Sequence, residues 1–294
     1  MRKFHTLSEL QSKINPNYYS GKGASIYSDF TTYASLGRGL ANACANYLLA
    51  TTNARVLPVG EIGIGNGQFC IDFLSAIGGK AKITYHAYDF SEKMLDELER
   101  KNKMFGVDIE THLFDAAKGK NIDERLDYCI LNELITDLPT EMVCKKKGEL
   151  YDVLFTKDLK ETKLEKTTKI NEKLAKNMPE DYFIPLNIVG LQLLKNLMEK
   201  CKHISVFDYG FDEFYLPSDM WNLNAAREYG GQVTTDSNFI FMKNELEKHG
   251  LNVKLEKQFE FIDKHSNGKK EKMKNEKEKE IAEDDYFYHL SVSC

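Results

Sequence analysis

The sequence predicts an α/β protein with a mostly parallel central sheet, because strand-like and helix-like patterns alternate along the chain. The strand near residues 126–133 is apolar almost to its polar end, which is typical of the buried centre of a parallel sheet. The last two strands have no helical pattern between them, so we expect them to form an antiparallel hairpin. The seven predicted strands lie near residues 55–59, 82–89, 108–115, 126–133, 203–210, 251–262 and 286–292.

Helical spacing of apolar residues follows several of these strands. A helix is expected from Phe69 onward, and a second follows Ser91, which is a suitable N-cap residue. Residues 188–198 carry a strong helical pattern, and residues 238–249 form another that Gly250 can close. Five βα units and a terminal hairpin of this kind predict a mostly parallel sheet with an antiparallel edge.

The turn after the first strand carries glycines at alternate positions, Gly63, Gly65 and Gly67, with Glu61 just before them. Such a turn lets a ligand approach the backbone and directs free helix N–H groups toward it. The dinucleotide fingerprint would need its third glycine at Gln68. The spacing instead resembles the first motif of Rossmann-like S-adenosylmethionine (SAM) methyltransferases, whose cationic cofactor a carboxylate can favour. Taken alone, the motif is also compatible with an ordinary glycine-rich turn.

A second acid, Asp89, ends the strand at residues 82–89, roughly 20 residues after the turn. A carboxylate at this place in a βαβ unit accepts hydrogen bonds from ribose hydroxyls. A surface aspartate is the alternative for Asp89 by itself. Its distance from the glycine turn favours the ribose-binding interpretation.

Polar residues end five of the predicted parallel strands. Ligands of open α/β sheets bind beyond the carboxyl ends of the strands, where these side chains would meet. The sequence therefore predicts one site at this edge of the sheet. The residues concerned are Glu61, Asp89, Asp115, Asn132 with Glu133, and Asp208.

Composition limits the class of protein. The 294 residues are 42% hydrophobic, which allows a sizeable core, and a net charge of −5 disfavours nucleic acid as a partner. The six cysteines are scattered without a C-x-x-C pair, so they predict neither a metal site nor a disulfide framework, and Cys70 and Cys129 are expected to be buried. No signal peptide and no run near the roughly 20 apolar residues of a membrane span is present, so we expect a cytoplasmic protein with no membrane partner.

We expect a single domain over residues 1–294, with three segments outside its core. Residues 1–52 form an N-terminal cap segment. Residues 142–185 form an insertion or lid between strands four and five, beginning with a hairpin at 143–154 and continuing as a Lys-rich, helical and solvated stretch at 157–176. Residues 264–283, rich in Lys and Glu, form a charged mobile loop within the terminal hairpin.

These residues together resemble the MidA-type SAM methyltransferase family, which includes the mitochondrial methyltransferase needed for respiratory complex I assembly. The resemblance is ordered along the chain and extends over about residues 15 to 262. Its most specific parts are the N-terminal D-F-x-T and the N-E…L-P elements. In chain order, the matching elements are Tyr18-Tyr19-Ser20 with residues 28–32, residues 61–67, residues 85–91, Asn132-Glu133-Leu134 with Leu138-Pro139, residues 207–210, and more weakly residues 231–234 with Asn238-Phe239.

The resemblance implies a Rossmann-like class I methyltransferase fold and SAM as the cofactor. The residues expected to bind the cofactor are Glu61, Gly63, Gly65, Gly67, Asp89, Phe90, Asp115, Ala116 and Asn132.

The resemblance also implies methyl transfer to a protein side chain, arginine being the acceptor known for the family. A guanidinium is protonated at neutral pH, so carboxylates must orient it and localise its charge. We expect Glu133 to do this, with Asn132 helping to hold the donor or the acceptor. Asp29 and Asp208 are second choices. The N-terminal segment that carries Tyr18, Tyr19 and Phe30 would close over the cofactor, or else pack on the core as an apolar strap.

Departures from the family pattern concern the substrate more than the cofactor. Thr136 stands where the family has an acid, with Asp137 one place later, and Gln232 and Asn238 replace two further acids. Two alternatives therefore stay open: a methyltransferase acting on another protein residue or a small molecule, and a catalytically silent SAM-binding assembly factor that contacts a partner through residues 157–176. The expected partners are a protein substrate and, as a candidate assembly, a second copy in a homodimer.

Overall fold

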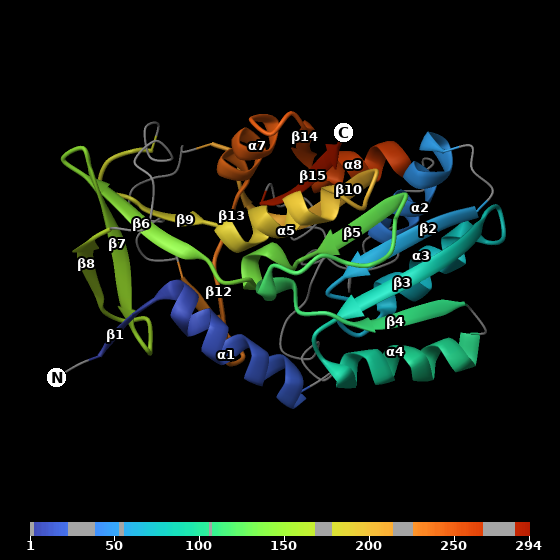
Figure 1. Cartoon of the computed structure of the whole chain (residues 1–294), viewed down its shortest axis with the longest axis horizontal. Helices are drawn as coiled ribbons and strands as arrows, with labels where there is room; N and C mark the ends of the chain where they lie inside the picture. The colour runs from blue at the N-terminus through green and yellow to red at the C-terminus, as the bar shows by residue number, and fades with distance from the viewer. Residues whose placement is uncertain are drawn as a thin grey trace, which may run out of the picture.

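The chain forms a large sheet covered by helices and a smaller sheet at one end (Figure 1). We obtained this arrangement from a computed structural model. The structure describes residues 3–22, 39–52, 56–105, 108–167, 178–213, 226–266 and 286–294.

The large sheet has the strand order β14-β15-β10-β5-β2-β3-β4, and its pairs are parallel except those that β15 makes with β10 and β14. The two-residue strand β13 (Ser237–Asn238) adds to β10. The prediction of a mostly parallel seven-stranded sheet whose last two strands pair antiparallel is confirmed, with β13 as an addition. The seven strands are β2 (Val56–Ile62), β3 (Lys82–Asp89), β4 (Ile109–Leu113), β5 (Tyr128–Asn132), β10 (His203–Phe211), β14 (Asn252–Lys257) and β15 (Phe287–Ser293).

Helices cover both faces of this sheet because its strands are apolar on both sides. Tyr85 and Ala87 of β3 belong to one buried cluster, and Tyr88 belongs to the other. The first cluster contains residues of α2, α3, α4 and α8, and the second contains residues of α5 and α7. The bounds of these helices are α2 (Gly39–Thr51), α3 (Gln68–Ile77), α4 (Glu92–Phe105), α5 (Ile188–Met198), α7 (Phe239–Glu247) and α8 (Gln258–His265).

The strand β2 lies between β3 and β5 in the sheet. The chain therefore adds β3 on one side of β2 and later adds β5 on the other side. Ile62 of β2 pairs with Tyr88 of β3 and with Leu131 of β5, which aligns the carboxyl ends of the three strands. Ligands of open α/β sheets bind at such a switch point. The fold therefore places a site beyond Ile62.

The smaller sheet is built largely from the segment between β5 and β10. Its strand order is β1-β7-β6-β9, and β8 pairs with β7. Lys147 and Gly148 have φ values of 53° and 79°, as a two-residue hairpin turn requires, and the predicted hairpin is confirmed as β6 and β7. The five strands are β1 (Phe4–Thr6), β6 (Glu141–Lys146), β7 (Glu149–Thr156), β8 (Thr162–Lys166) and β9 (Phe183–Leu186).

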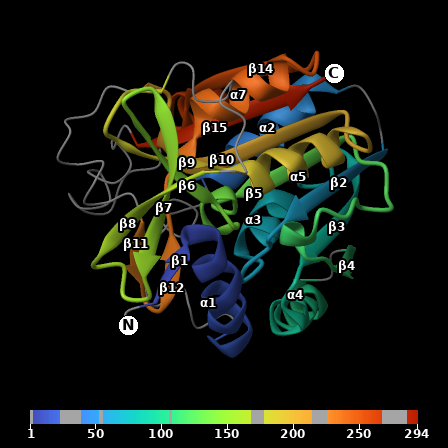
Figure 2. The ribbon, with the colours of Figure 1, turned by 60° about the vertical axis from the view of Figure 1, so that its left-hand side comes forward.

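The helix α1 (Leu7–Lys22) connects the two sheets. Its residues Leu7 and Leu10 share a small core with Met142 and Phe155 of the smaller sheet. Figures 1 and 2 both show α1 beside β12 (Gln232–Thr234), which pairs with β11 (Arg227–Tyr229). The N-terminal segment is thus anchored to both the insertion and the late part of the chain.

Part of the Lys-rich stretch at residues 157–176 is a strand, so the prediction of a helix there is wrong where it can be compared. Thr162–Lys166 forms β8, and Leu164 packs on the small core while the flanking Lys163 and Glu165 are exposed. This alternation has the period of a strand. Residues 168–177 lie outside the described part of the chain.

The predicted strand at residues 251–262 ends at Lys257, and α8 follows it, so the last two strands do have a helix between them. The backbone N–H of Lys257 donates to Oε2 of Glu260 at 3.3 Å, and Phe261 is fully buried. An acid that accepts from the backbone three residues earlier marks a helix start. Residues 267–285, most of the expected charged loop, are not described. No helix in the part of the chain that the structure describes is both long and apolar enough to cross a membrane.

Candidate active site

A cavity of about 1040 Å³ opens beyond the carboxyl ends of β2, β3 and β5. The glycine turn and the residues at the ends of β3 and β5 form one wall, and α1, the turn at 135–137 and β12 form the other. Of the predicted site residues, those on the wall are Glu61, Gly63, Gly65, Asp89, Phe90, Asp115, Ala116, Asn132 and Glu133.

Gly67 shapes the glycine turn but is not among the residues that line the cavity, so its contact with a cofactor stays a prediction. It is the N-cap residue of α3 with φ 71°, a left-handed conformation that side chains disfavour. A Cβ atom at this position would lie 2.6 Å from Cδ1 of Leu98. Gly67 is therefore needed for the turn and for close packing of α4, while Gly63 and Gly65 face the cavity.

Glu61 is a buried carboxyl group on the cavity wall, only 2% exposed. Burial raises its pKa to about 8, although the hydroxyl of Tyr85, which donates to Oε2 at 2.6 Å, acts in the opposite direction. The group is therefore largely protonated at neutral pH in the unliganded protein. A cation placed beside it would favour the charged carboxylate.

Asp89 ends β3 and is held by the backbone that follows. The N–H of Ser91 donates to Oδ1 at 2.9 Å, which orients the carboxyl group toward the start of α4. Burial raises the pKa of Asp89 to about 6, and backbone hydrogen bonds limit the rise. The group lies on the cavity wall with its neighbour Phe90, at the place where a ribose-binding acid was predicted.

Asp115 lies at the rim next to the end of β4. It caps the short 3-10 helix Ala116–Lys118 by accepting from the N–H of Ala117 at 3.0 Å, and its other oxygen is 3.0 Å from Nζ of Lys118. Both Asp115 and Ala116 line the cavity. This turn forms the wall next to the Asp89 end of the site.

The end of β5 has an unusual backbone. Glu133 has φ 50°, a left-handed conformation that is uncommon for a residue other than glycine. Its N–H donates to the carbonyl of Phe207 at 2.7 Å, which fixes the turn against β10. Oδ1 of Asn132 is buried and has no hydrogen-bond partner among the residues described, although Asn132 lines the cavity. Strained residues and unsatisfied polar atoms of this kind gather at functional sites.

The N-terminal helix forms the opposite wall. Nδ2 of Asn15 donates to the carbonyls of Asp137 and Val233 at 2.9 and 2.8 Å, and Tyr19 donates its hydroxyl to Oδ2 of Asp137 and to Oε1 of Gln232, the latter at 2.5 Å. Burial raises the pKa of Asp137 to about 6, and hydrogen bonds from Tyr19 and Thr234 oppose the rise. The N-terminal segment thus lies over the cavity as expected for Tyr19. Asp29 and Phe30 lie outside the described residues.

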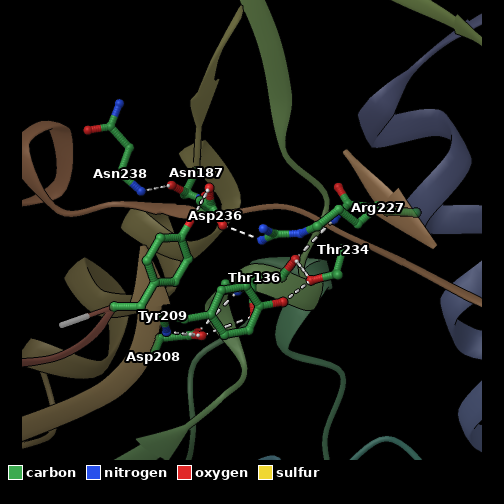
Figure 3. A network of polar contacts seen from close by, with 10 residues as sticks. Thr136, Asn187, Asp208, Tyr209, Arg227, Thr234, Asp236 and Asn238 are labelled. Carbon is green, nitrogen blue, oxygen red and sulfur yellow. Dashed lines mark hydrogen bonds and ion pairs between the residues drawn. The ribbon is translucent and has the colours of Figure 1, made fainter. Parts of the chain in front are cut away.

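Asp208, a second-choice catalytic residue, does not line the cavity. It is completely buried and accepts hydrogen bonds from the N–H and hydroxyl of Thr136 at 3.2 and 3.1 Å (Figure 3). Burial raises its pKa to about 8. We therefore assign Asp208 to holding the turn at 135–137 rather than to contact with a substrate.

A second group of buried polar residues adjoins the cavity, and Arg227 and Tyr286 of this group line it. Arg227 forms an ion pair with Asp236, and Tyr286 donates to Asp236 at 3.1 Å. Figure 3 shows that Arg227 reaches across the network toward Asp236. Asn238, which stands at a family acid position, caps α7 by accepting from the N–H of Phe241 at 3.0 Å. Its role here is structural.

Sequence patterns did not identify the residues that α1, β11 and the residue before β15 add to the cavity. Gln11, Asn15, Arg227 and Tyr286 all line it. The only signal for the first two is a pair of amide side chains on the buried face of an amphipathic helix, which includes Leu7 and Leu10. Arg227 and Tyr286 reach the site through tertiary structure alone.

Residues 59–155 match the profile of a family described as "Methyltransferase domain". This segment runs from β2 through β7 and so includes the glycine turn, Asp89 and the Asn132–Glu133 end of β5. No curated protein matches the chain.

Solved structures share the fold. A Burkholderia thailandensis protein bound to S-adenosylhomocysteine is 15% identical, with a TM-score of 0.77 over 99% of this chain and 88% of that one. A second solved structure of a protein from the same organism is 14% identical, with a TM-score of 0.73 over 99% of this chain and 87% of that one. The CcbJ methyltransferase from Streptomyces caelestis is 12% identical, with a TM-score of 0.52 over 94% and 97%. The fold is therefore that of Rossmann-like methyltransferases.

Proposed function

We propose that this chain is a SAM-dependent methyltransferase that methylates a protein side chain, with arginine as the favoured acceptor. The observation that carries the proposal is that one cavity collects the glycine turn, Asp89 and the Asn132–Glu133 end of β5. The match of residues 59–155 to a methyltransferase domain and the resemblance to MidA-type methyltransferases support it. The S-adenosylhomocysteine complex among the similar structures supports the choice of cofactor.

The residues present fit SAM. Glu61 can balance the cationic part of the cofactor, Asp89 can accept hydrogen bonds from ribose hydroxyls, and the buried Oδ1 of Asn132 can accept a hydrogen bond from a ligand. Gly63 and Gly65 leave backbone exposed to the cavity on the same wall. When bound, SAM supplies an electrophilic methyl group.

The acceptor side of the cavity suits a cationic side chain. Glu133, just before the short turn at 135–137, and Asp137, the last residue of that turn, both line it. Two carboxyl groups can orient a guanidinium and localise its charge, which leaves one nitrogen available as the nucleophile. Tyr19 fixes Asp137 by a hydrogen bond, so this acid can keep its orientation while a substrate binds. Placement and exclusion of water are the main catalytic contributions expected.

The proposal predicts that Glu133→Gln lowers the rate of methyl transfer by about 100-fold or more, because the variant loses the charge that orients the acceptor. SAM affinity should change little. The matched control is Glu165→Gln, which removes an exposed carboxylate from β8, outside the cavity. The measurement is transfer of a tritiated methyl group into a lysate, followed by mass spectrometry of the labelled band. Full activity of Glu133→Gln would contradict the assigned role.

The same experiment separates the alternatives. Thr136 bonds to Asp208 instead of offering a carboxylate at the family position, which favours an acceptor other than arginine as the second candidate. A label on a different residue or on a small molecule would identify that candidate. SAM binding without label in any product would indicate a silent SAM-binding assembly factor.

A further inference from the structure

A second cluster of polar side chains lies on the sheet outside the cavity. The register of β3 and β4 pairs His86 with Glu110 and Tyr88 with His112, so all four side chains project from the same face of the sheet. Glu124, from the segment that leads to β5, reaches the same place. None of these residues lines the candidate active site.

The donor atoms of this cluster converge at distances that suit a metal ion. Nδ1 of His86 lies 3.2 Å from Nε2 of His112, and ligand atoms of His86, His112 and Glu124 all lie within 4.8 Å of one another. Tetrahedral Zn²⁺ with ligands at about 2.0–2.1 Å separates neighbouring ligand atoms by roughly 3.3 Å. Oε2 of Glu110 is 3.5 Å from Nδ1 of His86 and could serve as a further donor.

We propose that His86, His112 and Glu124 bind a zinc-like divalent cation at the β3–β4 edge of the sheet. Two imidazoles and one carboxylate are ligands that Zn²⁺ accepts, and they leave a position for water or Glu110. The site is separate from the methyl-transfer site and does not depend on the proposed function.

The residues around the three proposed ligands hold the ligand side chains in place, as the neighbours of ligands do in known metal sites. The hydroxyl of Tyr88 donates to Oε2 of Glu124 at 2.5 Å, and the Tyr88 ring stacks on His112 with centroids 4.6 Å apart. Such neighbours fix the orientation of ligands and raise metal affinity. The side chain of His86 is 8% exposed, whereas His112 and Glu124 are 25% and 28% exposed, so a cation can enter from solvent.

A bound cation would connect β3, β4 and the segment before β5. That segment begins with the turn at Asp115 and Ala116, which lines the active-site cavity.

The test is a titration of the metal-free full chain with Zn²⁺ by calorimetry and with Co²⁺ by absorption spectroscopy. The parent chain and the three variants named below should also be prepared with Cys294→Ser, because Cys294 is the exposed thiol and could bind the metal itself. We expect one equivalent to bind and the melting temperature to rise. His112→Ala and Glu124→Gln, which change partly exposed residues, should each weaken binding at least about tenfold. His249→Ala should not, because His249 lies at the end of α7.

Circular dichroism establishes whether each variant is folded, and Glu124→Gln provides the mildest change if His112→Ala does not fold. Binding that disappears with Cys294→Ser, or that is equal in the parent, His112→Ala and Glu124→Gln, would overturn the proposal. Absence of any bound Zn²⁺ or Co²⁺ would overturn it too, and would leave the two imidazoles as a hydrogen-bonded pair.

Discussion

Glu61 shows, in a single side chain, how the cavity can favour a cationic ligand. It stands at the end of β2, is almost fully buried, and receives a hydrogen bond from Tyr85. Its pKa rises from an ordinary 4.5 to about 8 because burial disfavours the charged form. A cation bound beside this acid would favour its carboxylate form.

The pH dependence of stability follows from that shift. Because the pKa of Glu61 is higher in the folded protein than in the unfolded chain, protonation of Glu61 contributes its full stability below pH 4.5. This contribution is lost as the pH rises from 4.5 through 8. Glu61→Gln resembles the protonated form and avoids this loss. Between pH 5 and 8, the free energy of unfolding of the wild type should fall by up to ~3 kcal/mol relative to Glu61→Gln. Urea unfolding of both ligand-free proteins measures it, and parallel pH profiles would refute the prediction.

Single residues were predictable from the sequence where a local pattern imposes them. The spacing of Gly63, Gly65 and Glu61 identified one wall of the cavity, and Asp89 followed from its distance along the chain. Asp208 belongs to the same set of strand-end acids, yet it points into the protein and binds Thr136. The polar residues at strand ends predict which edge of the sheet carries the site, but they do not predict the direction in which each side chain points.

At the scale of elements, α1 determines whether the second wall exists. Gln11 and Asn15 bind backbone groups of the turn at 135–137 and of β12, which other segments of the chain supply. Asn15 makes three such bonds, because its Oδ1 also accepts from the N–H of Val233 at 2.8 Å. Buried amide side chains of the helix therefore hold it against the turn at 135–137 and against β12.

Replacing Asn15 with Ala should destabilise the protein by about 2–3 kcal/mol, because buried backbone groups of Val233 and Asp137 would lose their partner. It should also weaken SAM binding, since α1 lines the cavity. Asn17→Ala is the matched control: Asn17 is exposed and, among the described residues, bonds only to the carbonyl of Lys13 at 2.8 Å, so its effect should be within about 0.5 kcal/mol. Denaturant unfolding compares the two variants, and equal losses would contradict this account of α1.

Elements were predictable where periodicity and a cap agreed. Residues 82–89 form β3 as expected, and the helix after Ser91 is α4. The strand β8 and the helix α8 were not predicted, each for a physical reason. The five residues of β8 are mostly charged or polar, so its alternation of apolar and polar residues is weak. In α8, two phenylalanines at alternate positions give the spacing that is typical of a strand. Packing against the small core and the cap by Glu260 decide these cases.

At the scale of the whole molecule, the cavity lies where the large sheet, α1 and the late strands meet. Gln11 contacts Thr140 across 129 residues, and Asn15 contacts Val233 across 218 residues. The central sheet could be predicted because its units are local in sequence. The second wall could not, because contacts at such separations leave no periodic signal, and Arg227 and Asp137 show their position only in the folded chain.

We expect the cavity to bind SAM between the glycine turn and Asp89. Calorimetric titration of the full chain with SAM tests it most directly, with Asp89→Asn as the variant and Asp158→Asn, an exposed aspartate of the smaller sheet, as the control. We predict one SAM per chain for the wild type and the control, and a loss of at least about tenfold in affinity for Asp89→Asn. No heat of binding for the wild type, or equal affinity in all three proteins, would contradict the account.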